Sequence, residues 1–551
     1  MGDTAAACER VARQALGLTD LRPGQLRAMT ALAEGRDTLV VMPTGSGKSA
    51  IYQVPALLLR GPTLVVSPLI ALQRDQVEAL RDRDEEAVSL DAGTRAVERA
   101  ETFQALRAGE TEFLFCAPEQ LARPDVLREL AAAAPSLMVV DEAHCVSAWG
   151  HDFRPDYLRL GAVADALGRP VVAALTATAA PPVRAEIAER LGMRAPVEIV
   201  QGFDRPSISL EVRRALDDPA ADIVTTVAAA KQPGIVYTTS RRQTGRLSGL
   251  LAQAGVWAAA YHAGLRRAER DAVHDRFMAG DLDVVVATNA FGMGIDKPDV
   301  RFVLHAEIPG SPDAYYQEIG RAGRDGEPAD AVLFYRPEDL GVQRFFTGGT
   351  PDEERLARVA EAVAESGPGS DRKALAERAG LSARRLTALL DLLERAGAVR
   401  LGTRKVDPVP GLDPRAAASR ARELAERRRD VDRSRLEMMR RYAETTDCRR
   451  RFLLGYFGEE LADNCGNCDT CRAGTAERAP RESGPFPLHA RVEHRAWGPG
   501  QVIQRGEDRL TVLFEDAGYR ELQLDVVLDE NLLTESGRAT GSPTPTPEIR
   551  S

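Results

Sequence analysis

The sequence has few cysteines, almost no lysine, no excess of positive charge and no long apolar run. Seven cysteines in 551 residues are too few for a disulfide framework, which indicates a reducing, cytoplasmic compartment. The apolar runs are too short to span a membrane, and the first 16 residues lack the apolar core of a secretory signal. The net charge of −10 means that nucleic acid could bind only at local basic patches. Five lysines among 72 basic residues indicate a genomic bias toward arginine.

The composition, 44% hydrophobic and 28% charged, is that of a globular protein. A chain of this length is expected to fold into about three to five domains.

Residues 42–49, Met-Pro-Thr-Gly-Ser-Gly-Lys-Ser, lie between an apolar run at 38–41 and a helical pattern that begins at Ala50. Glycines let such a loop point its N–H groups at phosphate oxygens, and the following helix N-terminus adds positive charge. The lysine then reaches the terminal phosphates, and the last hydroxyl binds Mg²⁺. Met42 replaces the first glycine of the general pattern, and a glycine-rich turn is the alternative interpretation. The predicted ATP-binding residues of the loop are Thr44, Gly45, Ser46, Gly47, Lys48 and Ser49.

Upstream of this loop, Gln25 offers a donor and an acceptor that suit the N6/N7 edge of adenine, although Pro-Gly-Gln is also an ordinary turn. Downstream, a buried strand at 137–140 is followed by Asp141-Glu142-Ala143-His144. With a phosphate loop, Asp141 would hold Mg²⁺ and Glu142 would polarise the attacking water. A solvated acidic loop is the alternative, but it does not explain the apolar strand.

The acidic motif runs directly into residues 145–157, where Trp149, Phe153 and Tyr157 alternate with glycine, proline, His151 and Arg154. Aromatic side chains usually belong to the core. Interleaved with polar residues, they favour a loop that stacks on nucleic-acid bases.

A second α/β unit begins near Phe203, with strands expected at 234–237, 258–261, 283–286 and 302–304. It has no phosphate loop of its own. Arg321 and Arg324 lie three residues apart and are placed to project at a phosphate held by the first unit, as an arginine finger does.

These motifs, in this order, resemble the RecQ family of superfamily 2 DNA helicases over residues 10–340. The resemblance implies two RecA-like lobes, at 1–200 and 201–345, and 3′→5′ unwinding driven by ATP and Mg²⁺ in repair and recombination. It implies the catalytic residues Lys48, Asp141, Glu142, Gln317, Arg321 and Arg324, and adds Arg22 and Asp296 to the ATP site. The DNA-coupling residues that it implies are His144, Trp149, His151, Phe153 and Arg154. Leu18 and Leu21 replace the family's adenine-stacking aromatic residues, which implies a looser contact with the base.

After a glycine- and proline-rich stretch at 347–370, interpreted as a linker, residues 371–400 show two apolar helical faces separated by Gly380. This pattern predicts a winged-helix-like domain at 350–406, which would bind DNA or another protein. In the RecQ family such a domain follows the zinc site, whereas here it precedes it.

Residues 415–451 hold 13 arginines against 7 acids and predict a long helix or a helical pair, either a DNA track or a solvated surface. Cys448, Cys465, Cys468 and Cys471 follow with the spacing of a tetrahedral zinc site, with iron–sulfur ligation as the minor alternative. Together they form a helical zinc-binding domain at 412–475, which again resembles RecQ.

A linker at 476–487 leads to residues 488–533, which alternate polar and apolar with turns at 498–500, 506–508 and 516–518. The pattern predicts a small antiparallel SH3/Tudor-like barrel. It resembles the C-terminal domain of PcrA/UvrD helicases, which docks on a partner protein. The tail, 534–551, is predicted to be disordered.

The leading hypothesis is an ATP-dependent DNA helicase with ATP, Mg²⁺ and Zn²⁺ as cofactors, acting on single-stranded and forked DNA without membrane association. A translocase that does not separate strands and a non-enzymatic DNA-binding adaptor are the alternatives.

Overall fold

The computed structural model describes residues 2–22, 24–43, 45–68, 70–83, 85–91, 93–147, 155–292, 295, 297–346, 349, 351–402, 405–476, 485–488, 490–506, 508–514 and 517–535. The chain divides into two compact units, 1–477 and 478–551, which are described separately. None of the helices in these ranges combines the length and apolarity of a membrane span.

Lobe 1 is built on a seven-stranded parallel sheet with strand order β3-β4-β2-β5-β6-β1-β7. Most of its strands are short apolar runs that are fully buried, as a parallel sheet covered by helices requires. The strands are β1 (Thr38–Val41), β2 (Thr63–Val66), β3 (Ala87–Leu90), β4 (Phe113–Cys116), β5 (Leu137–Val140), β6 (Val171–Thr176) and β7 (Val197–Val200). The helices are α1 (Gly2–Gln14), α2 (Gln25–Ala33), α3 (Lys48–Ala56), α4 (Ile70–Arg81), α5 (Ala96–Ala108), α6 (Pro118–Leu121), α7 (Pro124–Ala133), η1 (Ala143–Val146), η2 (Pro155–Arg159), α8 (Leu160–Ala166) and α9 (Pro181–Arg190).

Lobe 2 has a six-stranded parallel sheet with order β10-β11-β9-β12-β13-β8. The predicted strands at 234–237 and 258–261 have the expected bounds, the strand predicted at 283–286 is shifted by one residue, and the strand predicted at 302–304 is one residue longer. The strands are β8 (Ile208–Arg214), β9 (Gly234–Tyr237), β10 (Ala258–Tyr261), β11 (Val284–Ala287), β12 (Phe302–His305) and β13 (Ala329–Tyr335). The helices are α10 (Ala220–Ala229), α11 (Arg241–Gln253), α12 (Arg267–Ala279), α13 (Pro312–Ile319) and α14 (Asp339–Phe346).

Next comes an inserted domain, formed by α15 (Glu353–Ser366), β14 (Ser370–Asp371), α16 (Arg372–Ala379), α17 (Ala383–Arg395), β15 (Val399–Leu401) and β16 (Lys405–Pro408). The interpretation of 347–370 as a linker is wrong, because α15 occupies most of it. Leu356, Val359, Ala360 and Val363 recur at helical spacing and are buried in the domain's own core. The glycines and proline that suggested a linker lie at the ends of the helix.

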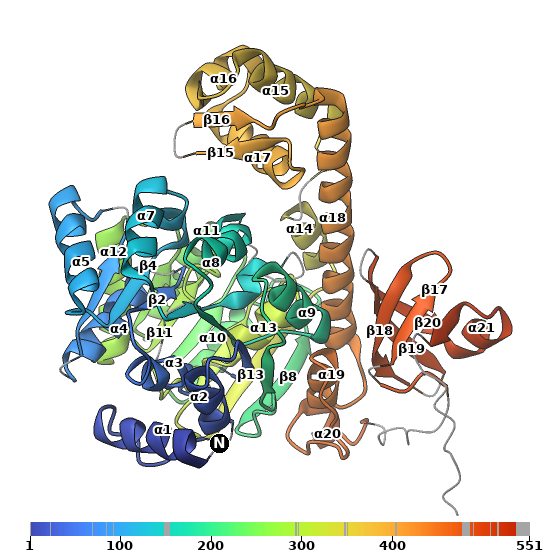
Figure 1. Cartoon of the computed structure of the whole chain (residues 1–551). Coiled ribbons are helices and arrows are strands. Elements are labelled where there is room, and N and C mark those ends of the chain that lie inside the picture. The colour runs from blue at the N-terminus through green and yellow to red at the C-terminus, as the bar shows by residue number, and fades with distance from the viewer. Residues whose placement is uncertain are drawn as a thin grey trace, which may run out of the picture. The chain divides into compact units, whose positions relative to one another are not determined.

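The predicted long basic helix is confirmed as α18 (Pro414–Glu444), a single helix of 31 residues (Figure 1). It starts at Asp413, whose side chain accepts hydrogen bonds from the N–H groups of Arg415 and Ala416. Its first turns pack into the core of the inserted domain and its last turns into the core of lobe 2. Two short helices follow, α19 (Arg449–Tyr456) and α20 (Asp469–Arg472).

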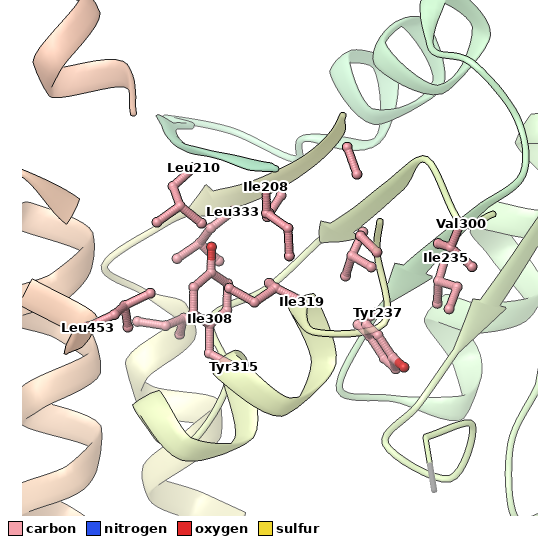
Figure 2. Close-up of a cluster of buried hydrophobic side chains, with 14 of the residues drawn as sticks. Ile208, Leu210, Ile235, Tyr237, Val300, Ile308, Tyr315, Ile319, Leu333 and Leu453 are labelled. Atoms are coloured by element: carbon pink, nitrogen blue, oxygen red, sulfur yellow. The ribbon is translucent and has the colours of Figure 1, made fainter. Parts of the chain in front are cut away.

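The core of lobe 2 extends into this helical region. Figure 2 shows part of it, with Leu453 of α19 directed toward Ile308 and Tyr315. Tyr442, Cys448 and Cys468 belong to the same buried cluster. The zinc-binding region therefore has no separate core, although its sequence pattern is that of a separate domain.

The second unit is an antiparallel sheet with order β20-β19-β18-β17-β21. Its elements are β17 (Arg491–His494), β18 (Gly498–Arg505), β19 (Arg509–Phe514), β20 (Gly518–Gln523), α21 (Leu524–Asp529) and β21 (Leu533–Glu535). Among the described strands β20 and β21 are the two edges, so the sheet is open and the prediction of a closed barrel is wrong. Gly498–Gly500, predicted as a turn, begins β18, and the helix α21 was not predicted.

Replacing Leu390 by Ala is expected to lower the free energy of unfolding of the inserted domain by about 2–5 kcal/mol. Leu390 is fully buried in that core, and its truncation leaves a cavity. The measurement is urea unfolding followed by limited proteolysis. Thr387→Ala, on the exposed face of α17, is the control, and equal effects of the two changes would contradict the assigned core.

Candidate active site

The loop between β1 and α3 has the backbone of a phosphate-binding loop. Gly45 and Gly47 have φ of +73° and +75°, which favours glycine, and Gly47 caps α3. The Lys48 ammonium donates to the carbonyls of Met42 (3.1 Å) and Pro43 (3.2 Å). Met42 continues β1, since its N–H donates to the carbonyl of Thr176 (3.1 Å) and its side chain is buried. A glycine is therefore not needed at this position, which explains the departure from the general pattern.

Arg22 and Gln25 contact the same loop. The Gln25 amide donates to the carbonyls of Ser46 (3.0 Å) and Gly47 (3.1 Å), and its oxygen accepts from the N–H of Arg22 (2.7 Å). The Arg22 guanidinium donates to the carbonyl of Gly45 (2.6 Å). Both residues thus support the loop backbone, and the contact of Gln25 with adenine stays a prediction. Thr44 lies outside the described residues.

The acidic pair follows β5 at the carboxyl edge of the sheet. Glu142 adopts φ 49° and ψ 46°, a left-handed conformation that is uncommon outside glycine and is often found at functional sites. Its N–H donates to the Asp141 carboxylate (2.9 Å). Burial and then the Glu142 charge raise the pKa of Asp141 to about 7, and Lys48 lowers it. Burial likewise lowers the pKa of Lys48, and the two carboxylates oppose this. The lysine and both acids therefore share one electrostatic site.

These donors suit Mg²⁺, a hard cation that takes oxygen ligands. The Asp141 carboxylate would supply one ligand and the Ser49 hydroxyl, 3.5 Å from the Gln76 amide, another. Gln76 also accepts a hydrogen bond from Tyr52 (2.6 Å), which fixes its orientation.

His144 is buried next to the acids, and its coupling to DNA stays a prediction. Its Nδ1 lies 2.9 Å from Thr176 Oγ1 and 3.3 Å from the Glu142 carboxylate. The Thr176 hydroxyl donates to the carbonyl of Thr178 (3.1 Å), so a His144 ring protonated on Nδ1 can donate to the Thr176 oxygen. The residue thus connects Glu142 to the end of β6.

Tyr157 is also buried, and its hydroxyl donates to the carbonyl of Asp141 (3.1 Å). It belongs to the core, not to a base-stacking surface. Trp149, His151, Phe153 and Arg154 lie outside the described residues.

The two arginines after α13 take different positions. A Cβ built on Gly45 would lie 3.3 Å from Cδ of Arg324, so the aliphatic part of this lobe 2 side chain rests on the phosphate loop of lobe 1. Arg321 is buried within lobe 2, where a Cβ on Gly292 would lie 3.1 Å from its guanidinium. The sequence predicts that both arginines project at the phosphate, and of the two it is Arg324 that contacts the loop. Gln317 is buried on α13, and Asp296 lies outside the described residues.

One charged residue near this site was not predicted. Arg205, in the connection between the lobes, contributes with Arg324 to lowering the pKa of Lys48. Arg205 lies within residues 10–340, over which the motifs resemble the RecQ family, and that was the signal available in the sequence.

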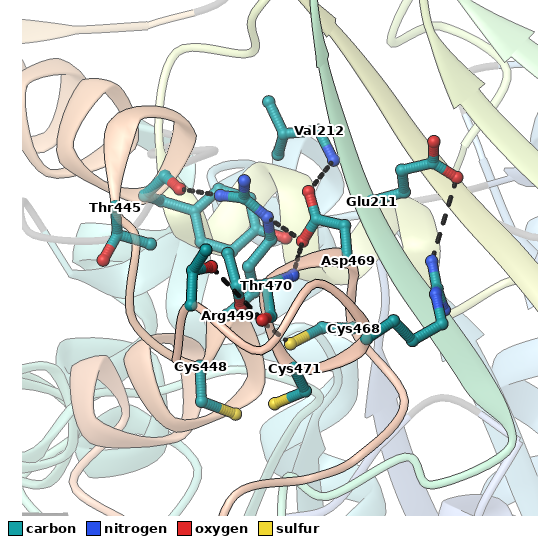
Figure 3. A network of polar contacts seen from close by, with 12 residues as sticks. Glu211, Val212, Thr445, Cys448, Arg449, Cys468, Asp469, Thr470 and Cys471 are labelled. Atoms are coloured by element: carbon teal, nitrogen blue, oxygen red, sulfur yellow. Dashed lines mark hydrogen bonds and ion pairs between the residues drawn. The ribbon is translucent and has the colours of Figure 1, made fainter. Parts of the chain in front are cut away.

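The four clustered cysteines come together as predicted. All four sulfur atoms lie within 4.8 Å of one another. Figure 3 shows three of these cysteines, Cys448, Cys468 and Cys471. Hydrogen bonding among the crowded sulfurs raises the pKa of Cys465 and lowers that of Cys468. Four thiolates at these distances need a cation to offset their repulsion, and tetrahedral Zn²⁺ suits four sulfur donors.

Polar contacts hold the cysteine loop, residues 465–471, against β8, which is an edge strand of the lobe 2 sheet. The Asp469 carboxylate accepts from the guanidinium of Arg449 (2.5 Å) and from the N–H of Val212 (3.0 Å), as Figure 3 shows. Leu210 and Cys468 form a parallel β-bridge. The metal ligands are therefore positioned by lobe 2.

Three domain families match the chain. They are the DEAD/DEAH box helicase domain over residues 22–186, the helicase conserved C-terminal domain over 220–326 and the RecQ zinc-binding domain over 415–472. The last match contains all four cysteines, which favours zinc over an iron–sulfur cluster.

Two relatives come from Bacillus subtilis (strain 168). The chain is 40% identical over 334 residues to the probable ATP-dependent DNA helicase RecS, covering 60% of this chain and 67% of the relative. It is 34% identical over 457 residues to the ATP-dependent DNA helicase RecQ, covering 83% of this chain and 65% of the relative. The chain thus spans about two thirds of the length of these relatives.

Among solved structures, the crystal structure of DUF1998 helicase MrfA bound to DNA and AMPPNP matches with a TM-score of 0.53 at 21% identity. The match covers 76% of this chain and 63% of that one, and it supports the fold alone.

The phosphate loop and the acidic pair fall within the matched helicase domain, and the cysteine cluster falls within the matched zinc-binding domain. By sequence and by the geometry of its sites, the chain belongs to the RecQ family of ATP-dependent DNA helicases.

Proposed function

We propose that this chain hydrolyses ATP to move 3′→5′ along one DNA strand and to separate it from its complement, in DNA repair and recombination. The observation that carries the proposal is the contact of Arg324 with Gly45. A nucleotide on the phosphate loop would be touched by both lobes, so its hydrolysis would change how the lobes meet. Since its substrate is chromosomal DNA, we place the chain in the bacterial cytoplasm, at the nucleoid.

In this proposal Lys48 binds the terminal phosphates, and Asp141 and Ser49 hold Mg²⁺. When bound, the ion would neutralise phosphate charge. Glu142 orients the attacking water, and Arg324 stabilises the charge that develops on the transferred phosphoryl group. Gln317 and Arg321 support the turn that carries Arg324, and Thr44 and Asp296 complete the ATP site.

We assign contact with the DNA bases to Trp149, His151, Phe153 and Arg154. The supporting observation lies at the two ends of their loop. Glu142 and His144 precede it, and Tyr157 after it is bonded to the Asp141 carbonyl. Bases that displace the loop would therefore shift the catalytic acids.

The proposed domains are the lobes at 1–200 and 201–345, a winged-helix-like domain at 350–406, the zinc-binding domain at 412–475, a linker at 476–487, a Tudor/SH3-like domain at 488–533 and a tail at 534–551. The Tudor-like domain would dock on a protein of the replication, repair or transcription machinery. The observation that supports this domain type is the five-stranded antiparallel sheet.

The charge of the inserted domain favours duplex DNA over a protein as its partner. Residues 367–408 hold nine basic and five acidic residues, whereas residues 351–366 hold five acidic and two basic ones. Arg384 and Arg385 are exposed at the start of α17, and Arg400 and Lys405 are exposed on the β15–β16 hairpin. A helix and a hairpin with this charge suit the duplex arm of a fork.

The proposed function predicts ATP-dependent strand displacement on forked DNA with a 3′ single-stranded tail. Lys48→Ala should abolish displacement and ATP turnover while DNA binding persists, because Lys48 binds phosphate and the DNA surface lies elsewhere. A gel-based displacement assay is the measurement. ATP turnover without displacement would instead support the translocase, and DNA binding without turnover would support the adaptor.

Arg324→Ala should leave ATP affinity within a few fold and reduce turnover on the order of 10³-fold or more, because an arginine finger acts on the transition state. Turnover and binding of a fluorescent ATP analogue are measured on the same protein. Arg344→Ala, on α14, serves as a control of equal charge. If Arg324→Ala lowered ATP affinity and turnover by the same factor, Arg324 would bind phosphate without a specific role in the transition state.

Removing Arg384 and Arg385 together should lower the salt dependence of forked-DNA binding by about two counterions, because each phosphate contact contributes about one. Single-strand binding should not change. The measurement is fluorescence anisotropy from low to high salt. Arg355→Ala with Arg358→Ala on α15 removes the same charge from the acidic side of the domain, and an equal slope change there would contradict the assigned face.

A further inference from the structure

The two parallel sheets are joined by residues 201–207, which connect β7 to β8. At the lobe 1 end, the N–H of Gln201 donates to the carbonyl of Val41 (2.9 Å) and extends the β1–β7 ladder. At the lobe 2 end, the N–H of Ala329 donates to the carbonyl of Ser207 (3.0 Å). The segment is therefore anchored in one lobe at each end, and any change in the angle between the lobes must occur within it.

Aromatic packing fixes Phe203 to lobe 2 and the zinc-binding region. The rings of Phe203 and Phe457 stack at 4.6 Å between centroids with an interplanar angle of 15°. The N–H of Phe203 donates to the Glu459 carboxylate, and its carbonyl accepts from the Tyr316 hydroxyl of α13 (2.6 Å). Both backbone polar groups of this residue are thus satisfied from outside lobe 1.

The next residues are held in the same way. The Arg450 guanidinium pairs with the Asp204 carboxylate at 3.0 Å and donates to the carbonyl of Ile208 (2.6 Å). The side-chain amide of Asn467, between two cysteines of the zinc site, donates to the carbonyl of Pro206 (3.1 Å). Residues 203–207 therefore move with lobe 2, which leaves Gly202 as the pivot.

Arg205 points from this fixed segment to the turn that carries the arginine finger. Its guanidinium donates to the carbonyls of Gly320 and Ala322, each at 3.3 Å. These carbonyls follow the C-terminus of α13, where the helix leaves acceptors unpaired and a cation is favourable. They flank Arg321 and lie just before Arg324, so Arg205 fixes the backbone from which Arg324 projects.

We propose that Arg205 is a positioning residue for Arg324, and that the zinc-binding region acts on ATP turnover by holding residues 203–207 against lobe 2. The zinc-binding region is then part of the hinge of the motor as well as a neighbour of lobe 2. The proposal rests on the ATPase activity proposed above, but not on strand separation.

The test is ATP turnover by Arg205→Ala and Arg205→Lys. Arg205→Ala should lower kcat between about ten- and a hundredfold, because a small displacement of a catalytic group has effects of this size. The KM for ATP and the affinity for a fluorescent ATP analogue should stay within about threefold of the wild type. Arg205→Lys keeps the charge but not the forked geometry, and should recover part of kcat.

Arg213→Ala is the matched control. Arg213 lies on β8, and its guanidinium bonds to Glu211 and Thr226, not to the turn after α13. It should leave kcat unchanged. Equal losses in the two Ala variants, or a loss of affinity that matches the loss of kcat in Arg205→Ala, would overturn the positioning role.

The contribution of the zinc-binding region is tested with Asp204→Asn, which breaks the pair with Arg450. It should lower kcat less than Arg205→Ala, and the double variant should be no worse than Arg205→Ala alone, because both changes act through one turn. Additive losses of kcat would contradict the proposal that the zinc-binding region acts on turnover through residues 203–207. A wild type that turns over ATP without separating strands would contradict the proposed function and leave this comparison intact.

Discussion

A parallel sheet ends in strands whose outer N–H and C=O groups lack a partner, and β8 is such an edge in lobe 2. The cysteine loop covers it. Asn467 accepts from the N–H of Leu210 (3.4 Å), and Asp469 accepts from that of Val212 (3.0 Å). A loop of this kind has little apolar surface of its own, so its folded conformation depends on the binding of four thiolates to one metal ion. The cysteine loop thus covers the sheet edge, carries metal ligands and contacts the connection between the lobes.

The charge of the long helix α18 also has a structural explanation. Residues 415–451, which span α18 and the start of α19, hold 13 arginines against 7 acids, and this count left a DNA track and a solvated surface equally open. Many of these arginines pair within the helix, as in Arg422–Glu426, Arg428–Asp432 and Arg440–Glu444. Arg449 and Arg450, which belong to the next helix, α19, are buried and pair with Asp469 and Asp204. Many arginines of this region therefore have a structural role, and α18 connects two cores.

The sequence predicted those parts of the fold that depend on neighbouring residues. Lys48, Asp141 and the four cysteines are recognised because each motif combines local chemistry with an adjacent strand or helix. The helix α15 was missed, since glycine and proline at its ends hid the apolar spacing of Leu356, Val359 and Val363. Arg205 contacts the turn after α13, and Gly45 contacts Arg324. Each contact joins residues more than a hundred positions apart, so no local sequence pattern predicts it. The open sheet of the second unit was not predicted for the same reason. Alternation of polar and apolar residues predicts strands, but it does not predict whether the two edge strands pair to close a barrel.

The inserted domain contacts both lobes, and this limits how the motor can open. Through α18 it shares the helix that completes the core of lobe 2. It also meets lobe 1, where the Arg159 guanidinium pairs with Glu394 and donates to the carbonyl of Leu401 (3.2 Å). Arg159 ends η2, which follows the aromatic-rich loop and includes Tyr157. If the lobes pivot at Gly202, this contact must break or α18 must bend. A helix of 31 residues with paired charges resists bending, whereas a partly exposed ion pair is worth little. The contact with Arg159 is therefore the part that yields, and duplex DNA bound to the inserted domain would follow lobe 2.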